Sequence, residues 1–153
     1  MTDVKGIEKM MLTIKTTRFG KVETDKNRII HFPDGLLGFP EQKDYIILEH
    51  KPDSPFCWLQ SVTAPDLAFV MTNPFLLKKD YLEDLPPDDQ ALFIGENGKE
   101  HIIFALVTIP HGKAEKTTVN LLGPLIMDPG SKTGRQVILA NSGYNHRHPM
   151  ISE

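Results

Sequence analysis

The residues best suited to nucleophilic catalysis or metal binding in this sequence are Cys57 and the pair His146 and His148. A cysteine becomes a nucleophile when a histidine lies near it in space. Cys57 stands beside Trp58 in an apolar run, which favours a buried and unreactive thiol. His146 and His148 would share one face of an extended chain, but a zinc site also needs a third ligand and a fixed backbone. The pattern therefore favours surface histidines over a metal site.

A glycine-rich segment at 130–135 has the composition, but not the spacing, of a phosphate-binding loop. Backbone amides and a lysine converge on a phosphate when the spacing is Gly-x4-Gly-Lys-Ser/Thr, and this chain lacks it. The Gly-x-Ser-x-Gly motif of a serine nucleophile does not occur either. Because no catalytic set emerges, we expect no enzymatic activity, no cofactor and no metal.

A third group of reactive side chains is acidic and lies at 80–100. Its carboxylates are Asp80, Glu83, Asp84, Asp88, Asp89, Glu96 and Glu100, set against Lys78, Lys79 and Lys99. One interpretation is an ordinary solvated surface. The other is a docking surface for a basic protein, because opposite charge steers association.

Apolar residues around this acidic stretch would supply an apolar anchor, or else belong to the core; they are Phe75-Leu76-Leu77 before it and Tyr81-Leu82 within it. Apolar groups in a desolvated centre with a charged rim are the usual arrangement of a binding hot spot. Phe75 precedes the acidic residues, Tyr81 lies among them, and Tyr144 belongs to a polar tail with Arg147 and His148. We name as candidate partner-binding residues Phe75, Asp80, Tyr81, Glu83, Asp84, Asp88, Asp89 and Tyr144.

Composition and charge narrow the classes of protein. The chain has 153 residues and a net charge of −3, and its longest basic run is Lys78–Lys79. This disfavours nucleic-acid binding, although a patch assembled by folding stays open. One cysteine excludes an internal disulfide and suits a reducing compartment. We find neither an apolar run of about 20 residues nor the apolar centre of a signal peptide, so we expect a cytoplasmic protein without a membrane segment.

The elements that must position these residues are mostly short strands. Alternating or β-branched apolar runs between turn residues predict roughly nine strands. We expect them at 12–17, 22–24, 28–32, 45–50, 56–62, 67–72, 102–109, 117–122 continued past a bulge at 123–124 into 125–127, and 136–139. The run at 102–109 is the most apolar and predicts a central strand buried on both faces.

The remaining segments predict turns, one short helix and two polar ends. Pro86 and Pro87, followed by two aspartates, favour a helix start, so we expect a helix over 86–92 and a turn at 96–99. Residues 1–10 are predicted to be a flexible leader, and 141–153 a polar tail. The fold class is therefore mainly β: an antiparallel, barrel-like sheet of roughly nine strands with one short helix, formed by a single domain over 11–153.

Several motifs taken together resemble those of the FliW family of flagellar assembly factors. They are Phe19-Gly20, the run Ile-His-Phe-Pro-Asp-Gly-Leu-Leu-Gly-Phe at 30–39, and the segments 54–61, 65–69, 72–75, 107–110, 118–124 and 144–149. The chain departs from the family in having Asn73 where Asp is frequent and Cys57 where an aromatic residue is frequent. Residues 1–10 look like an extension.

The resemblance implies a FliW-like β-barrel without enzymatic activity, located in the bacterial cytoplasm. It implies two protein partners: newly made flagellin and the translational regulator CsrA. The factor antagonises CsrA until flagellin binds to the factor in its place. Two other functions stay open. One is a small β-barrel enzyme or ligand carrier with an internal cavity. The other is a general interaction module with unrelated partners.

Overall fold

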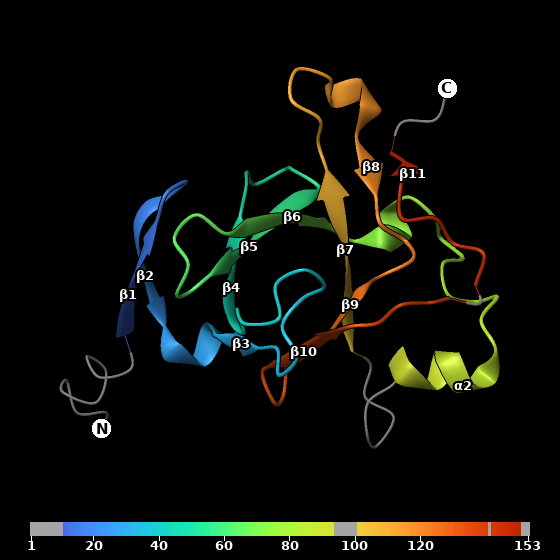
Figure 1. Ribbon diagram of the computed structural model, residues 1–153, viewed down its shortest axis with the longest axis horizontal. Coiled ribbons are helices and arrows are strands. Elements are labelled where there is room, and N and C mark those ends of the chain that lie inside the picture. The colour runs from blue at the N-terminus through green and yellow to red at the C-terminus, as the bar shows by residue number, and fades with distance from the viewer. Residues whose placement is uncertain (1–10, 94–100, 141, 151–153) are drawn as a thin grey trace.

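The protein is built on a closed β-barrel (Figure 1). The computed structural model describes residues 11–93, 101–140 and 142–150. Seven strands close the barrel in the order β3-β4-β5-β6-β7-β9-β10, because β10 pairs with β3 and β9 pairs with β7. Closure leaves no free edge around this ring, which is the usual protection of a sheet against association.

The strands are short. Their bounds are β1 Met11–Thr16, β2 Gly20–Asp25, β3 Ile30–His31, β4 Asp44–Glu49, β5 Phe56–Ser61, β6 Ala68–Thr72, β7 Ile102–Thr108, β8 Thr118–Val119, β9 Leu125–Asp128, β10 Thr133–Gln136 and β11 His148–Pro149. The helical elements are α2 Pro87–Gln90 and the 3-10 turns η1 Lys26–Arg28, η2 Pro74–Leu76, η3 Ala91–Phe93 and η5 Ala114–Lys116.

The expected mainly-β, barrel-like fold with one short helix is confirmed, with one difference in strand direction. The single parallel pair joins β10 to β3 through Thr133 and His31, whereas the other pairings among the described residues are antiparallel. The sheet is therefore mixed, because the ring closes where two strands run in the same direction.

The barrel interior is filled with apolar side chains. Seven buried residues form this inner cluster: Phe32, Leu36, Tyr45, Leu59, Met71, Leu125 and Met127. Phe32 and Tyr45 meet edge to face with their ring centroids 5.5 Å apart. Gly134 of β10 lies against Phe32, since a Cβ placed there would come within 2.6 Å of that ring.

A second, outer cluster packs on the outside of the barrel. Its buried members are Tyr81, Leu82, Leu85, Phe93, Ala105, Val107, Val119, Leu121, Ile126 and Leu139. Strand β7 separates the two clusters: Ala105 and Val107 join the outer one, whereas Phe104 and Leu106 pack on the inner one. The prediction that this strand is covered on both faces is thus confirmed for its middle. At both ends of the predicted run it is wrong, since Ile102 is 46% and Ile109 is 45% exposed.

A separate hairpin of β1 and β2 lies beside the barrel (Figure 1). Gly20, the first residue of β2 after the turn, has φ +68°, a conformation that glycine adopts at low cost. Phe19 meets the ring of Trp58 edge to face at 5.6 Å. The hairpin is therefore anchored to β5 through an aromatic contact.

Three expected strands are shifted or shortened. The strand expected at 136–139 begins earlier, at Thr133, because Gly134 allows close approach to Phe32. The strand expected at 117–122 is reduced to β8, because the side chain of Asn120 accepts from the backbone N–H groups of 122 and 123 and turns the chain. The strand expected at 28–32 is reduced to β3, because η1 occupies the residues before it.

The polar tail expected at 141–153 is attached to the barrel in its described part, 142–150. β11 pairs with β8, and Met150 N donates to Thr117 O at 3.0 Å. Tyr144 packs on the outer cluster. The leader expected at 1–10 and the turn expected at 96–99 lie outside the described residues, and the single-domain organisation of 11–153 stays a prediction.

Candidate partner-binding surface

The predicted acidic segment folds as a covering layer on the outer cluster. It comprises η2, α2, η3 and the turns between them, over residues 74–93, and Figure 1 places α2 at one side of the barrel. Tyr81 fixes its centre: the side chain is 1% exposed, and its hydroxyl donates to Leu121 O. The Tyr81 ring meets Phe75 at 5.8 Å and Tyr144 at 4.8 Å.

Leu82, directly after Tyr81, holds an uncommon backbone conformation. Its φ is +76°, in the left-handed region that a leucine rarely adopts. Its backbone N–H donates to the hydroxyl of Tyr144 at 2.8 Å, and its side chain is buried. The hydrogen bond to Tyr144, from the chain segment 142–150, therefore offsets the backbone strain at Leu82.

Two polar side chains hold the second half of the segment. Gln90 Nε2 donates to Glu83 O at 2.9 Å and to Leu85 O at 2.8 Å. Arg135 of β10 donates through Nη2 to Leu92 O at 3.1 Å. Sequence reasoning missed both side chains, and the bond of Arg135 joins residues 43 positions apart, which leaves no local pattern.

The carboxylates of the segment lie on its outer surface. Asp80 pairs with Lys78 at 3.0 Å, and the hydrogen bond from Lys78 lowers the pKa of Asp80. The other four have no ion-pair partner among the described residues. They are Glu83, Asp84 and Asp88, which are exposed, and Asp89, which is half-buried. The segment thus presents four carboxylates without an ion-pair partner among the described residues, and its five acidic and two basic residues give it a net charge of −3.

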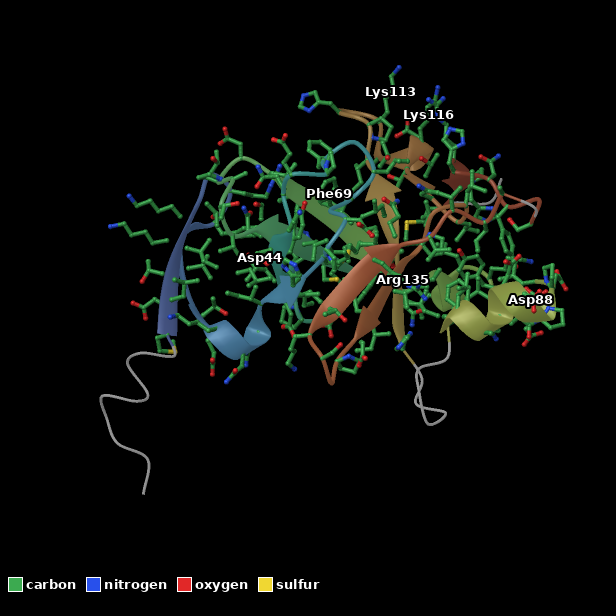
Figure 2. All side chains as sticks on the ribbon, turned by 60° about the horizontal axis from the view of Figure 1, so that its bottom comes forward. Asp44, Phe69, Asp88, Lys113, Lys116 and Arg135 are labelled. Carbon is green, nitrogen blue, oxygen red and sulfur yellow. The ribbon has the colours of Figure 1, made fainter. Side chains whose placement is uncertain are left out.

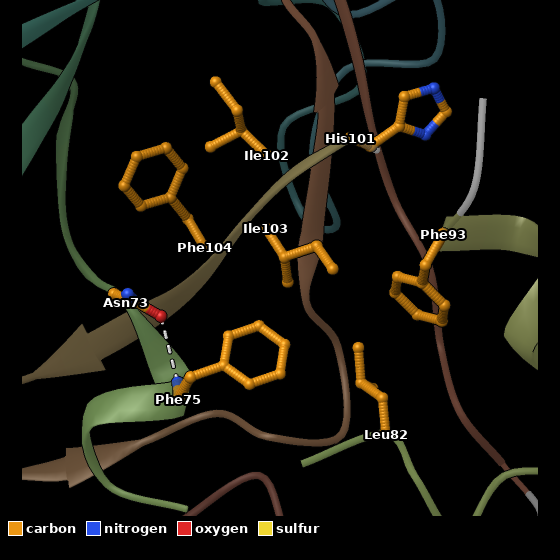
Figure 3. A pocket seen from close by; sticks show the side chains of 8 residues that line it. All are labelled: Asn73, Phe75, Leu82, Phe93, His101, Ile102, Ile103 and Phe104. Atoms are coloured by element: carbon orange, nitrogen blue, oxygen red, sulfur yellow. Dashed lines mark hydrogen bonds between the residues drawn. The ribbon is translucent and has the colours of Figure 1, made fainter. Parts of the chain in front are cut away.

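An apolar pocket of about 570 Å³ lies next to this segment (Figure 3). Figure 3 shows Phe75, Leu82 and Phe93 on one side and the residues of β7 on the other; the pocket is lined by Asn73, Phe75, Leu82, Phe93, His101, Ile102, Ile103 and Phe104. Residues 94–100, which connect Phe93 to His101 along the chain, lie outside the described residues. Of the residues predicted as an apolar anchor, Phe75 is half-buried and lines this pocket, whereas Leu82 is buried and belongs to the outer cluster.

Two of the candidate contact residues are part of the scaffold. Tyr81 is buried and therefore offers no surface to a partner, which corrects its assignment as a contact residue. The hydroxyl of the half-buried Tyr144 accepts a hydrogen bond from the backbone N–H of Leu82, so Tyr144 holds the acidic segment in place. Phe75 and the five carboxylates stay candidate contacts.

Asn73 caps the turn that starts the segment. Its Oδ1 accepts from Phe75 N at 3.0 Å, and Pro74 follows as the first residue of η2. An aspartate in place of Asn73 offers the same acceptor. Asn73 therefore caps η2 as well as the aspartate that is frequent in the family would.

We expect Asn73→Ala to lower the free energy of unfolding by about 1 kcal/mol, because the N–H of Phe75 loses its acceptor. Asn73→Asp is the matched control and changes stability by less than about 0.5 kcal/mol, because it restores a side-chain oxygen. Urea denaturation followed by circular dichroism measures both. Equal losses for the two variants would contradict the capping role.

The thiol of Cys57 is unsuited to nucleophilic attack. Burial, followed by the nearby charge of Glu49, raises the pKa of Cys57 to about 11. The side chain packs on the inner cluster. At neutral pH the thiolate is therefore disfavoured, in agreement with the interpretation of Cys57 as an unreactive core residue.

For His146 and His148 the sequence favoured surface histidines over a metal site. His146 is exposed, and His148 belongs to β11. In the part of the chain that the structure describes, no group of three or more His, Cys, Asp or Glu is placed to hold a metal ion. Within the same part of the chain, no helix has the length and hydropathy needed to cross a membrane. The inner cluster fills the barrel, which does not favour an internal ligand cavity.

Fold and surface together define a small β-barrel protein with a filled interior and a charged layer on its outside. The family model described as FliW protein matches residues 13–150, and the chain belongs to this family. The flagellar assembly factor FliW of Natranaerobius thermophilus is 37% identical over 142 residues, covering 93% of this chain and 94% of that protein. The one from Magnetococcus marinus is 36% identical, covering 93% and 86%.

A solved structure agrees with this assignment. The crystal structure of the flagellar assembly factor FliW superposes with a TM-score of 0.78 at 30% identity, covering 93% of this chain and 99% of that one. The resemblance inferred from the motifs is therefore confirmed for the family and for its barrel.

Proposed function

We propose that this chain is a cytoplasmic flagellar assembly factor that binds flagellin and antagonises the translational regulator CsrA, without catalysing a reaction. The family match over 13–150 carries the proposal. In this scheme, flagellin that accumulates occupies the factor and frees CsrA to repress flagellin translation. Export of flagellin then returns the factor to CsrA.

The acidic segment supports a role in binding CsrA. A regulator that binds RNA must present basic groups to phosphates. Four carboxylates without ion-pair partners among the described residues would attract such a surface. The rigid attachment of the segment through Tyr81 and Gln90 reduces the conformational entropy lost on binding.

The apolar pocket supports a role in binding flagellin. The terminal segments of flagellin are amphipathic helices that have no partner before assembly. A groove lined by apolar side chains holds such a helix by burying its apolar face. Phe75 and Ile103 line the pocket, and Leu76 beside it is 66% exposed. We assign flagellin to the pocket and CsrA to the carboxylates.

We expect reversal of Asp84, Asp88 and Asp89 to lysine to weaken CsrA binding about tenfold or more at low salt, because attraction becomes repulsion. Flagellin binding should change less, since the pocket is apolar. Titration of each purified partner by calorimetry measures both affinities.

The matched control reverses Glu23, Glu41 and Asp53, three exposed carboxylates outside the segment, and so changes the net charge equally. It should leave CsrA binding within about threefold of the parent, since distant exposed charges are screened. Unchanged CsrA affinity in the first variant, or an equal loss in the control, would remove the assignment of CsrA to this segment.

A further inference from the structure

A second groove, with the opposite charge, lies on another side of the molecule. It has a volume of about 1070 Å³ and runs along the start of β6 and the end of β7. Its cationic side chains are Arg18, Lys116 and Arg147, joined by His111 and His146. All five are exposed, and none of the residues that line the groove is Asp or Glu.

The cations of this groove are uncompensated. Among the described residues, the ion pairs are His31–Asp44 and Lys78–Asp80, so no carboxylate lies within ion-pair distance of Arg18, Lys116 or Arg147. Glu115 is next to Lys116 in the sequence but does not line the groove. A chain with a net charge of −3 thus gathers positive charge from three segments at one place.

The floor of the groove is apolar and includes the only tryptophan of the sequence. Trp58, Val70 and Ile109 contribute to it. Arg18 covers one face of the Trp58 ring, with its guanidinium carbon 4.3 Å from the ring centroid. The indole N–H donates to His50 Nδ1 at 3.2 Å. This arrangement combines an aromatic anchor with a cationic rim, as binding hot spots do.

The backbone around the groove suits an extended ligand. Pairing between β6 and β7 ends at Val70 and Val107, and residues beyond that point on both strands line the groove. A peptide in extended conformation alternates its side chains between two sides. It can therefore direct apolar groups to the floor while its carboxylates reach the rim.

We propose that this groove binds an extended acidic peptide segment of a partner protein, with carboxylates on Arg18, Lys116 and Arg147 and apolar side chains over Val70 and Ile109. A nucleic acid fits less well. Base stacking needs an open aromatic face, and Arg18 occupies one face of Trp58. The apolar floor and the acidic net charge also disfavour phosphates.

The groove is separate from the acidic segment. Figure 2 shows Lys113 and Lys116 at one end of the molecule and Asp88 at another side. Two partners of opposite charge would therefore bind without sharing contacts. The acidic-peptide site does not depend on the assignment of CsrA or flagellin.

Trp58 reports directly on this site, because its fluorescence is the only tryptophan signal of the chain. The probe is a short synthetic peptide of alternating glutamate and leucine, titrated into the full-length protein at low salt. We expect a saturable change in Trp58 emission that weakens as salt is added. The same peptide with lysine in place of glutamate should give no saturable change.

The variant Lys116→Glu with Arg147→Glu should weaken peptide binding about tenfold or more. The matched control is Lys26→Glu with Lys43→Glu, which reverses two exposed lysines outside the groove and should bind as the parent does. Circular dichroism checks that both variants fold. No binding of the acidic peptide, an equal loss in the control, or tighter binding of oligouridylate than of the peptide would overturn the proposal.

Discussion

Replacing Tyr81 by alanine should lower the free energy of unfolding by about 3–5 kcal/mol, because it removes a buried aromatic side chain and leaves a cavity. Tyr81 is 1% exposed and joins three parts of the chain. Its ring packs on Phe75 and Tyr144, and its hydroxyl donates to Leu121 O. Alanine keeps none of these contacts. Urea denaturation with linear extrapolation measures the loss.

A second substitution separates the ring from the hydroxyl. Tyr81→Phe keeps the ring but leaves the carbonyl of Leu121 without its donor, which costs about 1–2 kcal/mol. Leu76→Ala is the control, because Leu76 belongs to the same segment but is 66% exposed, so its loss should be below about 0.5 kcal/mol. A loss below about 1 kcal/mol for Tyr81→Ala would show that the segment does not depend on this anchor.

The anchoring has a consequence for binding. If Tyr81 holds the acidic segment in place, Tyr81→Ala should weaken CsrA binding even though it removes no charge. Leu76→Ala should leave CsrA binding unchanged, because it leaves the carboxylates in position. These two variants separate positioning of the segment from direct contact with the partner.

Local patterns in the sequence predicted most of the strands, since alternation and turn residues depend on near neighbours. β4, β5 and β6 lie where the apolar runs indicate, and α2 begins at the expected prolines. β10 was displaced because its position is set by the contact of Gly134 with Phe32, about a hundred residues earlier in the chain. Such a contact leaves no periodic pattern.

In the candidate site, too, local features were predicted from the sequence and long-range contacts were not. The acidic character of 80–89 is local, so the sequence indicated it. Which aromatic residue is core and which is surface depends on distant partners, Leu121 for Tyr81 and Leu82 for Tyr144. The basic groove could not be predicted, because Arg18, Lys116 and Arg147 come from separate segments and form no run. The functional class was predicted from the family motifs, because charge and periodicity alone did not indicate it.

The loop at 33–40 closes one part of the inner cluster, and Gly35 is its most constrained residue. Phe32 and Leu36 insert into the inner cluster on either side of Gly35. Leu36 and Phe39 exchange backbone hydrogen bonds of 2.8 and 3.4 Å. Leu37 N donates to Gln136 Oε1 at 2.8 Å and so fixes the loop to β10.

We expect Gly35→Ala to lower the free energy of unfolding by about 2–4 kcal/mol, for two additive reasons. Its φ is +66°, which disfavours any side chain. In addition, the new Cβ would lie 2.5 Å from Phe39 O and 2.7 Å from Pro40 Cα, so the backbone of the loop must move. Thermal and urea denaturation measure the loss.

Gly20→Ala separates the two causes. Gly20 has nearly the same φ, +68°, but a Cβ there meets nothing within 4 Å. Its substitution should therefore cost only the conformational part, about 1 kcal/mol. The difference between the two losses in unfolding free energy is the cost of displacing Phe39 and Pro40. Moving them also disturbs the packing of Leu36 on the inner cluster. Equal losses would mean that the loop relaxes freely and does not hold that end of the barrel.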